Sequence, residues 1–257
     1  MKIFYGNQTI DLFSDQEFPN GPPERVVTCL SGGCDSASLI YLIAKNFPET
    51  EIIPFHARDV QFLADTENAY AVCEYLQKKF PNVKIHDLET YDIDMYDPDW
   101  REKAEEARNL PSGKVLVNGK LEYKWRTLTA TAIALQNRKI REDIAEKYKT
   151  IVIGGMNCNP PVDTMKELGF YDVSERKRDP GVVSDKILDG HEYSPLLYVD
   201  KKFVAGVFRE NNLMDLFYLT KSCGWGVNDG NENYPEPCGK CFWCHERKWA
   251  FDLEKFE

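Results

Sequence analysis

Apolar residues in the first ninety positions follow two different periods that alternate along the chain. Short β-branched and aromatic runs at 25–30, 51–57 and 82–88 predict buried strands. Between them, residues 35–47 and 64–80 place apolar side chains at helical spacing. Strands that alternate with amphipathic helices are typical of a parallel sheet covered by helices. The pattern therefore predicts an α/β fold with a parallel, Rossmann-like sheet.

The remaining pattern adds elements around this core. A hairpin is expected at 2–13, before a linker rich in proline and glycine. A second hairpin is expected in an insert at 111–123, because Asn118-Gly119 joins two alternating runs and suits a tight turn. Residues 156–194 carry only weak helical signals. Longer signals predict a strand at 150–155 and helices at 125–148, 200–211 and 241–256.

The length of the chain limits the number of domains. Its 257 residues suffice for one large α/β domain with small additions, but not for two large domains. We divide it into an N-terminal hairpin and linker at 1–24, the α/β domain at 25–195 and a C-terminal helical subdomain at 196–257. No apolar run approaches the length of a membrane span, and the first residues lack an export signal. We therefore expect a cytoplasmic protein with no membrane partner.

The charge balance indicates the class of substrate. The chain has 32 Lys and Arg residues against 42 Asp and Glu residues, a net charge of -10. Proteins that bind the phosphate backbone of long nucleic acids usually present a broad basic face. We therefore expect a small substrate rather than a nucleic acid.

The stretch LSGGCDS, residues 30–36, lies between the first core strand and its helix. A helix that begins directly after a parallel strand offers unpaired backbone amides and the positive end of its dipole to an anion. Gly32 and Gly33 let phosphates approach the backbone closely, and Ser31 and Ser36 add hydroxyl donors. Asp35 would repel phosphates unless a cation lies between, so its role is to hold Mg²⁺ or to cap the helix. The stretch predicts a phosphate-binding loop.

The eight cysteines fall into two groups. Cys29, Cys34, Cys73 and Cys158 are scattered through the α/β region. The other four lie close together with C-x2-C spacing, a pattern that indicates a metal site in a cytosolic protein: Cys223, Cys238, Cys241 and Cys244. Four thiolates satisfy Zn²⁺ tetrahedrally and leave no open position, so a structural zinc is expected; an iron–sulfur cluster is the alternative.

The loop sequence S-G-G-x-D-S resembles the PP-loop of the ATP pyrophosphatase superfamily, whose fold is called adenine nucleotide α-hydrolase-like. Ser31, Gly32, Gly33, Asp35 and Ser36 match, and Cys34 fills the variable position. The resemblance implies that these six residues bind the pyrophosphate of ATP while the α-phosphate is attacked. It also places the adenine near His56, at the end of the second strand, and the strand end at Gly154 and Gly155 beside the nucleotide.

The segments TKSCGWG and CGKCFWCHERKWAF near the C-terminus resemble the 7-cyano-7-deazaguanine synthase family (QueC), which binds zinc through such cysteines. That family is an ATP-dependent carbon–nitrogen ligase. The resemblance implies adenylation of the carboxylate of 7-carboxy-7-deazaguanine and conversion, with free ammonia, to the nitrile by way of an amide. It also implies Mg²⁺ with the ATP, and a homodimer.

The central third of the chain departs from the family pattern. Arg126 stands where the family has a P-x-R-N segment, so the resemblance gives it a catalytic role beside Asp35 and a substrate-binding role. Asn157 lies in the place of the family's substrate loop, but the Tyr-Pro-Asp-Cys motif of that loop is absent. The substrate therefore stays open. The alternatives are a component of an anti-phage defence or conjugation system with another substrate, a tRNA-thiolating enzyme, and a non-catalytic zinc-stabilised binding protein.

Overall fold

The computed structural model describes most of the chain. The described residues are 1–60, 64–110, 114–117, 120–123, 128–155, 157–169, 187–188, 192–223 and 237–255. Arg126 and the Asn118-Gly119 turn lie outside them. Among the helices in these ranges, none has the length and apolar character needed to cross a membrane.

A six-stranded sheet forms the centre of the molecule, in the order β5-β4-β3-β8-β10-β9. Neighbouring strands from β5 to β10 pair in parallel, and only β9 pairs antiparallel. The predicted parallel α/β fold is therefore confirmed. In chain order the strands are β3 (Arg25–Cys29), β4 (Glu51–Asp59), β5 (Glu89–Ile93), β8 (Val152–Ile153), β9 (Ile187–Leu188) and β10 (Glu192–Tyr193).

The order of the strands reverses at β3. From β3 the chain builds outward through β4 to β5, and later returns to place β8 and β10 on the other side of β3. Ligands of open parallel sheets bind outside the carboxyl ends of the strands, where the order reverses. The loops that follow β3 and β8 therefore flank the position at which open parallel sheets commonly bind ligands.

Helices cover both faces of the sheet because successive strand residues point to opposite sides. Val26 and Ile153 join the larger apolar cluster, whereas their neighbours Val27 and Val152 join the smaller one. The larger face carries α1 (Cys34–Asn46), α2 (Ala64–Lys79), α6 (Lys201–Glu210), α7 (Met214–Leu219) and α9 (Phe242–Phe251). The smaller face carries α4 (Leu128–Tyr148), which packs on α3 (Pro98–Asn109); the short α5 (Val162–Glu167) follows β8.

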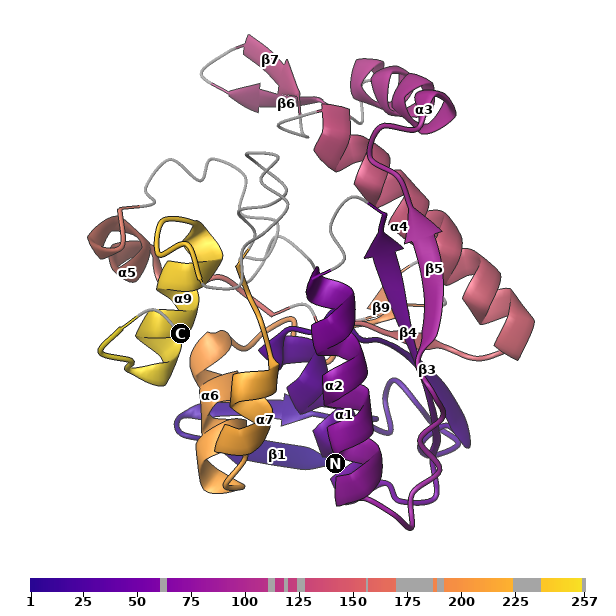
Figure 1. The fold of residues 1–257 in the computed structure, drawn as a ribbon, viewed down its shortest axis with the longest axis vertical. Helices are drawn as coiled ribbons and strands as arrows, with labels where there is room; N and C mark the ends of the chain where they lie inside the picture. The colour runs from indigo at the N-terminus through magenta and orange to yellow at the C-terminus, as the bar shows by residue number, and fades with distance from the viewer. Residues whose placement is uncertain are drawn as a thin grey trace.

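Both predicted hairpins are present. β1 (Lys2–Tyr5) pairs with β2 (Gln8–Asp11), and its Ile3 and Tyr5 belong to the same apolar cluster as Phe251 near the other end of the chain. β6 (Lys114–Val117) pairs with β7 (Lys120–Tyr123), and Figure 1 shows this second hairpin beside α3, beyond the ends to which β4 and β5 point. The three predicted segments of the chain thus share one main core, and their division into domains stays a prediction.

One predicted strand begins later than expected. Residues 82–88 make only an isolated bridge, between Ile85 and Ile52, and the strand proper is 89–93. Val83 and Ile85 are partly buried against the larger apolar cluster, which accounts for their apolar pattern although the pairing here is a single bridge. The long β4 extends past β3, and its second half supplies the edge that the later strand pairs with.

Glu51 at the start of β4 makes the fold sensitive to acid. Its carboxylate contacts Lys84, Arg25 and His86 at 2.5–2.7 Å, and these contacts, with Lys84 the strongest, lower its pKa to about 2. An unfolded glutamate has a pKa of about 4.3. Because the folded pKa is the lower one, the stabilisation is complete above about pH 4.3 and disappears as the pH falls through 2.

We therefore expect Glu51→Gln to lower the free energy of unfolding by up to about 1 kcal/mol at pH 7, because its partners are largely exposed. The difference from the wild type should shrink below pH 4 and vanish near pH 2. Urea unfolding at pH 7, 4 and 2 measures it, with the exposed Glu49→Gln as control. An undiminished difference at pH 2 would contradict this role for the carboxylate.

Candidate active site

The loop after β3 has the backbone geometry of an anion-binding turn. Gly32 has a φ of 77°, in the left-handed region that favours glycine. Gly33 is the extended N-cap residue of α1, and no side chain caps the helix at this position. A side chain at Gly33 would meet the backbone oxygen of Lys221 at 3.3 Å. The backbone conformation therefore favours glycine at position 32 and the neighbouring backbone leaves little room for a side chain at position 33, while the first turn of α1 retains amides suited to an external anion.

The two serines of the loop have different environments. Ser36 is buried; its hydroxyl donates to the Gly33 carbonyl at 3.1 Å and accepts from the Ser31 amide at 3.2 Å. Ser31 is exposed; its hydroxyl accepts from the Gly33 amide at 3.4 Å and lies 3.2 Å from that of Ser36. Ser36 therefore shapes the loop from inside, whereas Ser31 shapes it from the exposed side.

Asp35, in the first turn of α1, has two partners from distant parts of the chain. The Asn157 amide donates to one carboxylate oxygen at 3.2 Å, and the Lys201 ammonium is bonded to the other. The structure thus brings together two of the predicted site residues, Asp35 and Asn157. Gly33 rather than Asp35 is the N-cap. A carboxylate accepts more than two hydrogen bonds, so this arrangement leaves Asp35 able to contribute a ligand to Mg²⁺.

Lys201 was not among the predicted site residues. It is the first residue of α6, its side chain is 2% exposed, and its Nζ lies 3.7 Å from the fully buried Glu246 carboxylate. Burial by itself lowers the pKa of a lysine, but Asp35, Cys34 and Glu246 more than offset this effect and hold the Lys201 pKa above its usual value. A lysine in the first turn of a helix is unfavourable because it lies at the positive end of the helix dipole, unless carboxylates compensate its charge. The lysines at 201 and 202, directly after the N-cap Asp200, are therefore the sequence signal that could have indicated a lysine with carboxylate partners.

Gly154 and Gly155 directly follow β8 and lie beside the loop. A Cβ on Gly155 would lie 2.9 Å from the Ser36 amide nitrogen and 3.1 Å from the Asp35 carbonyl carbon, both backbone atoms. A Cβ on Gly154 would meet a side-chain oxygen of Glu192 at 3.3 Å. The glycine pair therefore lets the end of β8 pass against the first turn of α1, at the point where the strand order reverses.

His56 in β4 is buried, and both ring nitrogens are engaged within the protein. Nδ1 lies 2.9 Å from the Leu30 carbonyl oxygen, and Nε2 lies 3.2 Å from the Thr66 hydroxyl. Because a carbonyl can only accept, Nδ1 carries the hydrogen and Nε2 accepts from Thr66. Burial lowers the His56 pKa and keeps the ring neutral. The imidazole therefore braces the loop, and a contact between His56 and adenine would have to use the backbone.

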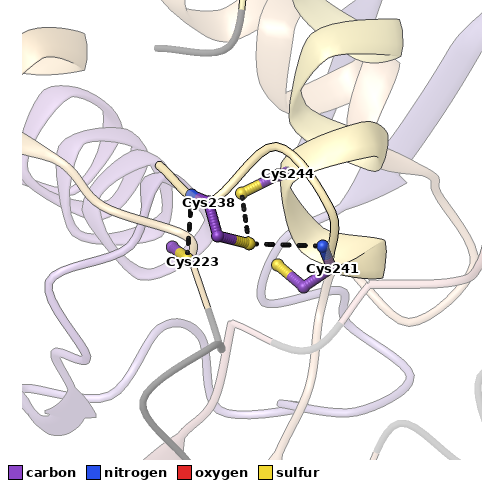
Figure 2. A group of neighbouring side chains, drawn as sticks. All are labelled: Cys223, Cys238, Cys241 and Cys244. Atoms are coloured by element: carbon purple, nitrogen blue, oxygen red, sulfur yellow. Dashed lines mark hydrogen bonds between the residues drawn. The ribbon is translucent and has the colours of Figure 1, made fainter. Parts of the chain in front are cut away.

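Cys223, Cys238, Cys241 and Cys244 come together at the start of α9. Their four sulfur atoms all lie within 4.8 Å of one another, and those of Cys238 and Cys244 are 3.8 Å apart (Figure 2). Four Zn–S bonds of about 2.3 Å place tetrahedral sulfurs about 3.8 Å apart. The cluster therefore fits one tetrahedral ion, and it is more compact than a four-iron cluster requires, in which each thiolate binds a different iron atom.

Backbone amides also support a metal at this cluster. The amides of Lys240 and Cys241 donate to the Cys238 sulfur at 3.4 and 3.3 Å, and the Cys238 amide donates to the Cys223 sulfur at 3.5 Å. Such donors stabilise thiolate ligands. The Cys241 thiol and burial raise the Cys244 pKa, so metal binding must displace protons from the cluster.

We expect the purified protein to contain one zinc ion per chain and to be colourless, because the sulfur spacing suits a single ion. Elemental analysis by mass spectrometry and a visible absorption spectrum measure both properties. Cys241→Ser should remove the metal, whereas Cys73→Ser, at a buried site remote from the cluster in sequence, should retain it. Stoichiometric iron with visible absorption would contradict a zinc site.

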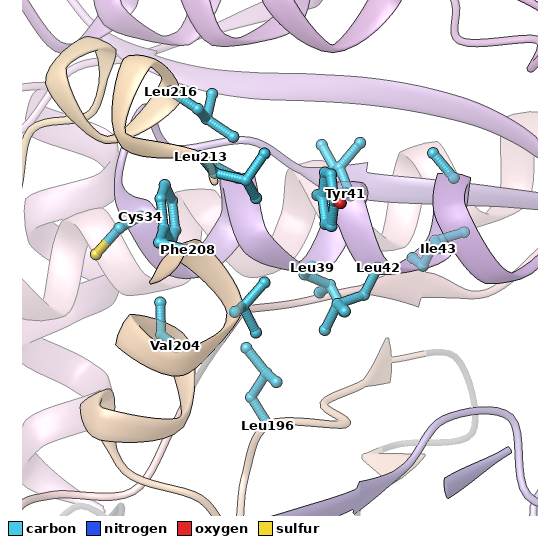
Figure 3. Close-up of a cluster of buried hydrophobic side chains, with 14 of the residues drawn as sticks. Cys34, Leu39, Tyr41, Leu42, Ile43, Leu196, Val204, Phe208, Leu213 and Leu216 are labelled. Atoms are coloured by element: carbon cyan, nitrogen blue, oxygen red, sulfur yellow. The ribbon is translucent and has the colours of Figure 1, made fainter. Parts of the chain in front are cut away.

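Cys34 packs inside the protein although it starts the helix after the loop. Figure 3 shows its side chain at the edge of the apolar cluster formed with Val204 and Phe208 of α6. The thiol lies 3.8 Å from the Ser222 hydroxyl, and burial raises its pKa. Cys34 is therefore a packing residue of low reactivity, and the loop can present only its backbone amide to a ligand.

Comparison with known proteins identifies similar solved structures. No protein-family model and no curated protein matches the chain. An NMN synthetase from Francisella tularensis is 18% identical, with 93% of this chain and 88% of that chain covered and a TM-score of 0.47. The U34-tRNA thiolase NcsA from Methanococcus maripaludis, solved with its 4Fe–4S cluster, is 13% identical over 89% and 64%, with a TM-score of 0.44.

The NH3-dependent NAD synthetase from Campylobacter jejuni is also similar. It is 17% identical over 79% of this chain and 70% of that chain, with a TM-score of 0.43. At these identities and TM-scores the comparisons assign no activity to this chain. The function is therefore argued from the site itself.

Proposed function

We propose that this protein is an ATP-dependent ligase that adenylates a carboxylate. The observation that carries the proposal is the loop at residues 31–36, with an uncapped helix start at the point where the strand order reverses. Backbone amides at such a position suit the phosphates of a nucleotide. Asp35 in the first turn of α1 supplies a carboxylate that can bind a metal ion, and Lys201 of α6, which is bonded to Asp35, supplies a cation close to these amides.

The proposed chemistry follows from these groups. A carboxylate oxygen of the acceptor attacks the α-phosphorus of ATP, the bond between the α-phosphorus and its bridging oxygen breaks, and pyrophosphate leaves. The amides around Gly32 and Gly33, with Mg²⁺ near Asp35, neutralise the charge that grows on pyrophosphate. Ammonia then attacks the acyl carbon of the adenylate and displaces AMP, which yields an amide.

The acceptor that we propose is 7-carboxy-7-deazaguanine or a related deazapurine, with Arg126 and Asn157 as substrate-binding residues. The similarity of the C-terminal segments to the 7-cyano-7-deazaguanine synthase family supports this choice. The amide oxygen then attacks the α-phosphorus of a second ATP and releases pyrophosphate; the nitrogen loses its two protons and AMP leaves with the former amide oxygen, which gives the nitrile. The net charge of -10 and the close sulfur spacing both weigh against tRNA thiolation with an iron–sulfur cluster.

The test is incubation with ATP, Mg²⁺, ammonium and 7-carboxy-7-deazaguanine, followed by mass spectrometry for AMP, pyrophosphate and the deazapurine product. We expect the nitrile, and loss of at least about 100-fold in rate for Asp35→Asn, since charge stabilisation at a leaving group has effects of this size. Asp15→Asn, at an exposed position, is the control. No AMP formation with this or other carboxylate acceptors would refute the ligase proposal; AMP formation with another acceptor alone would change the substrate.

A further inference from the structure

We infer that the four-cysteine site and the nucleotide loop are energetically coupled, so that a metal on the cysteines strengthens ATP binding. Glu246 and Arg247, in α9, are the positioning residues that carry the coupling. The inference rests on the proposed function, because it requires that the loop bind a nucleotide. It adds a role for the metal beyond holding the C-terminal helix in place.

The first connection runs through Glu246 and the buried lysine. Cys241 is the N-cap of α9 and Cys244 lies in its first turn, so a metal on the cluster fixes the start of this helix. Glu246, two residues further, is fully buried and lies 3.7 Å from the Lys201 ammonium. Lys201 is in turn bonded to Asp35 in the first turn of α1. The position of α9 therefore sets where this cation meets the loop.

The second connection runs through Arg247, which is also buried. Its guanidinium donates to the Thr220 hydroxyl at 3.0 Å, to the Ser222 hydroxyl at 3.4 Å and to the Phe217 carbonyl at 3.0 Å. It also lies over the Phe217 ring, 3.9 Å from the centroid. Arg247 therefore fastens the segment 220–222 to α9, directly before the metal ligand Cys223.

The same segment touches the nucleotide loop on its backbone. The Lys221 amide donates to the Gly32 carbonyl at 2.9 Å, and the Ser222 hydroxyl lies 3.8 Å from the Cys34 sulfur. The backbone of Lys221, two positions before Cys223, therefore stabilises the left-handed conformation at Gly32. A change in the position of Cys223 relative to α9 must be transmitted to this contact.

Both connections lead from the cysteine cluster to the loop at 31–36, one at Asp35 and the other at Gly32. Metal binding ties Cys223 to three ligands at the start of α9, and thereby restricts both the segment 220–222 and Glu246. A loop already held in its binding geometry loses less conformational freedom when the nucleotide binds. Linkage then requires that nucleotide binding strengthen metal binding by the same factor, typically about 5- to 150-fold.

The experiment measures this factor in both directions. The dissociation constant of Mg²⁺ and an α,β-methylene analogue of ATP is determined by calorimetry for the zinc-loaded protein and for protein stripped with a zinc-selective chelator. Zinc release to a competing chelator is then measured with and without the analogue. We expect at least fivefold weaker nucleotide binding without zinc, and the same factor in zinc affinity. Circular dichroism determines whether the stripped protein remains folded.

Variants of the zinc-loaded protein identify the residues that transmit the effect. Glu246→Gln keeps the shape of the side chain but removes its charge, and should reduce the coupling factor while one zinc per chain is retained. Glu254→Gln, at an exposed position beyond the same helix, is the matched control and should leave the factor unchanged. If the stripped protein unfolds, weaker nucleotide binding by zinc-loaded Glu246→Gln and Arg247→Lys decides the question.

The outcomes separate this inference from the proposed function. Equal nucleotide affinity with and without zinc in a folded protein would overturn the coupling and leave the ligase proposal standing. Coupling that persists unchanged in Glu246→Gln and Arg247→Lys would overturn their role as positioning residues. No nucleotide binding in either metal state would instead refute the nucleotide site on which both proposals depend.

Discussion

Lys201→Met is expected to lower the free energy of unfolding by about 3 kcal/mol and to abolish measurable nucleotide binding. The substitution keeps the length of the side chain but removes the cation between Asp35 and the fully buried Glu246. Removal of one partner from a buried ion pair destabilises a protein strongly, typically by 3 to about 5 kcal/mol. Urea unfolding and nucleotide titration by calorimetry measure the two effects.

Lys202→Met is the matched control for this experiment. Lys202 is the next residue in α6, but its side chain is exposed and its ammonium lies over the Trp249 ring, 4.8 Å from the centroid. Loss of such an exposed cation–π contact costs about 1 kcal/mol or less. We expect nearly unchanged nucleotide affinity. Wild-type binding by Lys201→Met would show that the buried lysine does not serve the loop.

Gly155→Ala is expected to have the second largest effect, a destabilisation of about 1–3 kcal/mol with at least tenfold weaker nucleotide binding. The new Cβ would lie 2.9–3.1 Å from backbone atoms of Asp35 and Ser36, and backbone of a helix start cannot rotate away as a side chain can. Overpacking of this kind displaces the neighbouring element. The first turn of α1 would shift, together with the amides that it offers to phosphates.

Gly154→Ala is the control that shows whether the effect of Gly155→Ala comes from its close approach to α1 or from any substitution in the glycine pair. Its Cβ would meet the ends of the Glu192 and Arg141 side chains at 3.3 and 3.7 Å, which can adjust by small rotations. We expect a smaller loss of stability and a nucleotide affinity within a few-fold of the wild type. Thermal unfolding and calorimetry on both variants test the difference; equal losses would mean that the close approach to α1 has no special effect.

The parallel sheet could be predicted from the sequence because its signals are local. Strand Arg25–Cys29 has β-branched, buried residues at three successive positions, and the helix that follows it, α1, is rich in buried apolar residues. The two-residue strands β8, β9 and β10 are too short to show a period, so of these only the region of β8 is anticipated, through the run before Gly154. The sequence predicts the third strand at 82–88 rather than at 89–93, because Val83 and Ile85 have the apolar spacing of a strand but pack against the larger apolar cluster.

The candidate site could be predicted where its residues are close in sequence. The loop 31–36 and the cysteines at 238–244 each carry their chemistry in one short segment, and the structure brings Cys223 to the latter. Lys201 lies in α6 whereas Glu246 and Arg247 lie in α9, and their role depends on how these two helices pack. The sequence also could not show that the His56 ring is buried and that both of its nitrogens already have partners within the protein, Leu30 and Thr66.

The pairing of β3 with β8 has a consequence for how the protein is made. Val27 pairs with Val152 and Thr28 with Ile153, so one side of the central strand has no partner until these much later residues have emerged from the ribosome. An unpaired edge on a nascent polypeptide invites aggregation. We therefore expect the growing protein to depend on chaperones until β8 emerges, and the loop after β3 to take shape only late in translation.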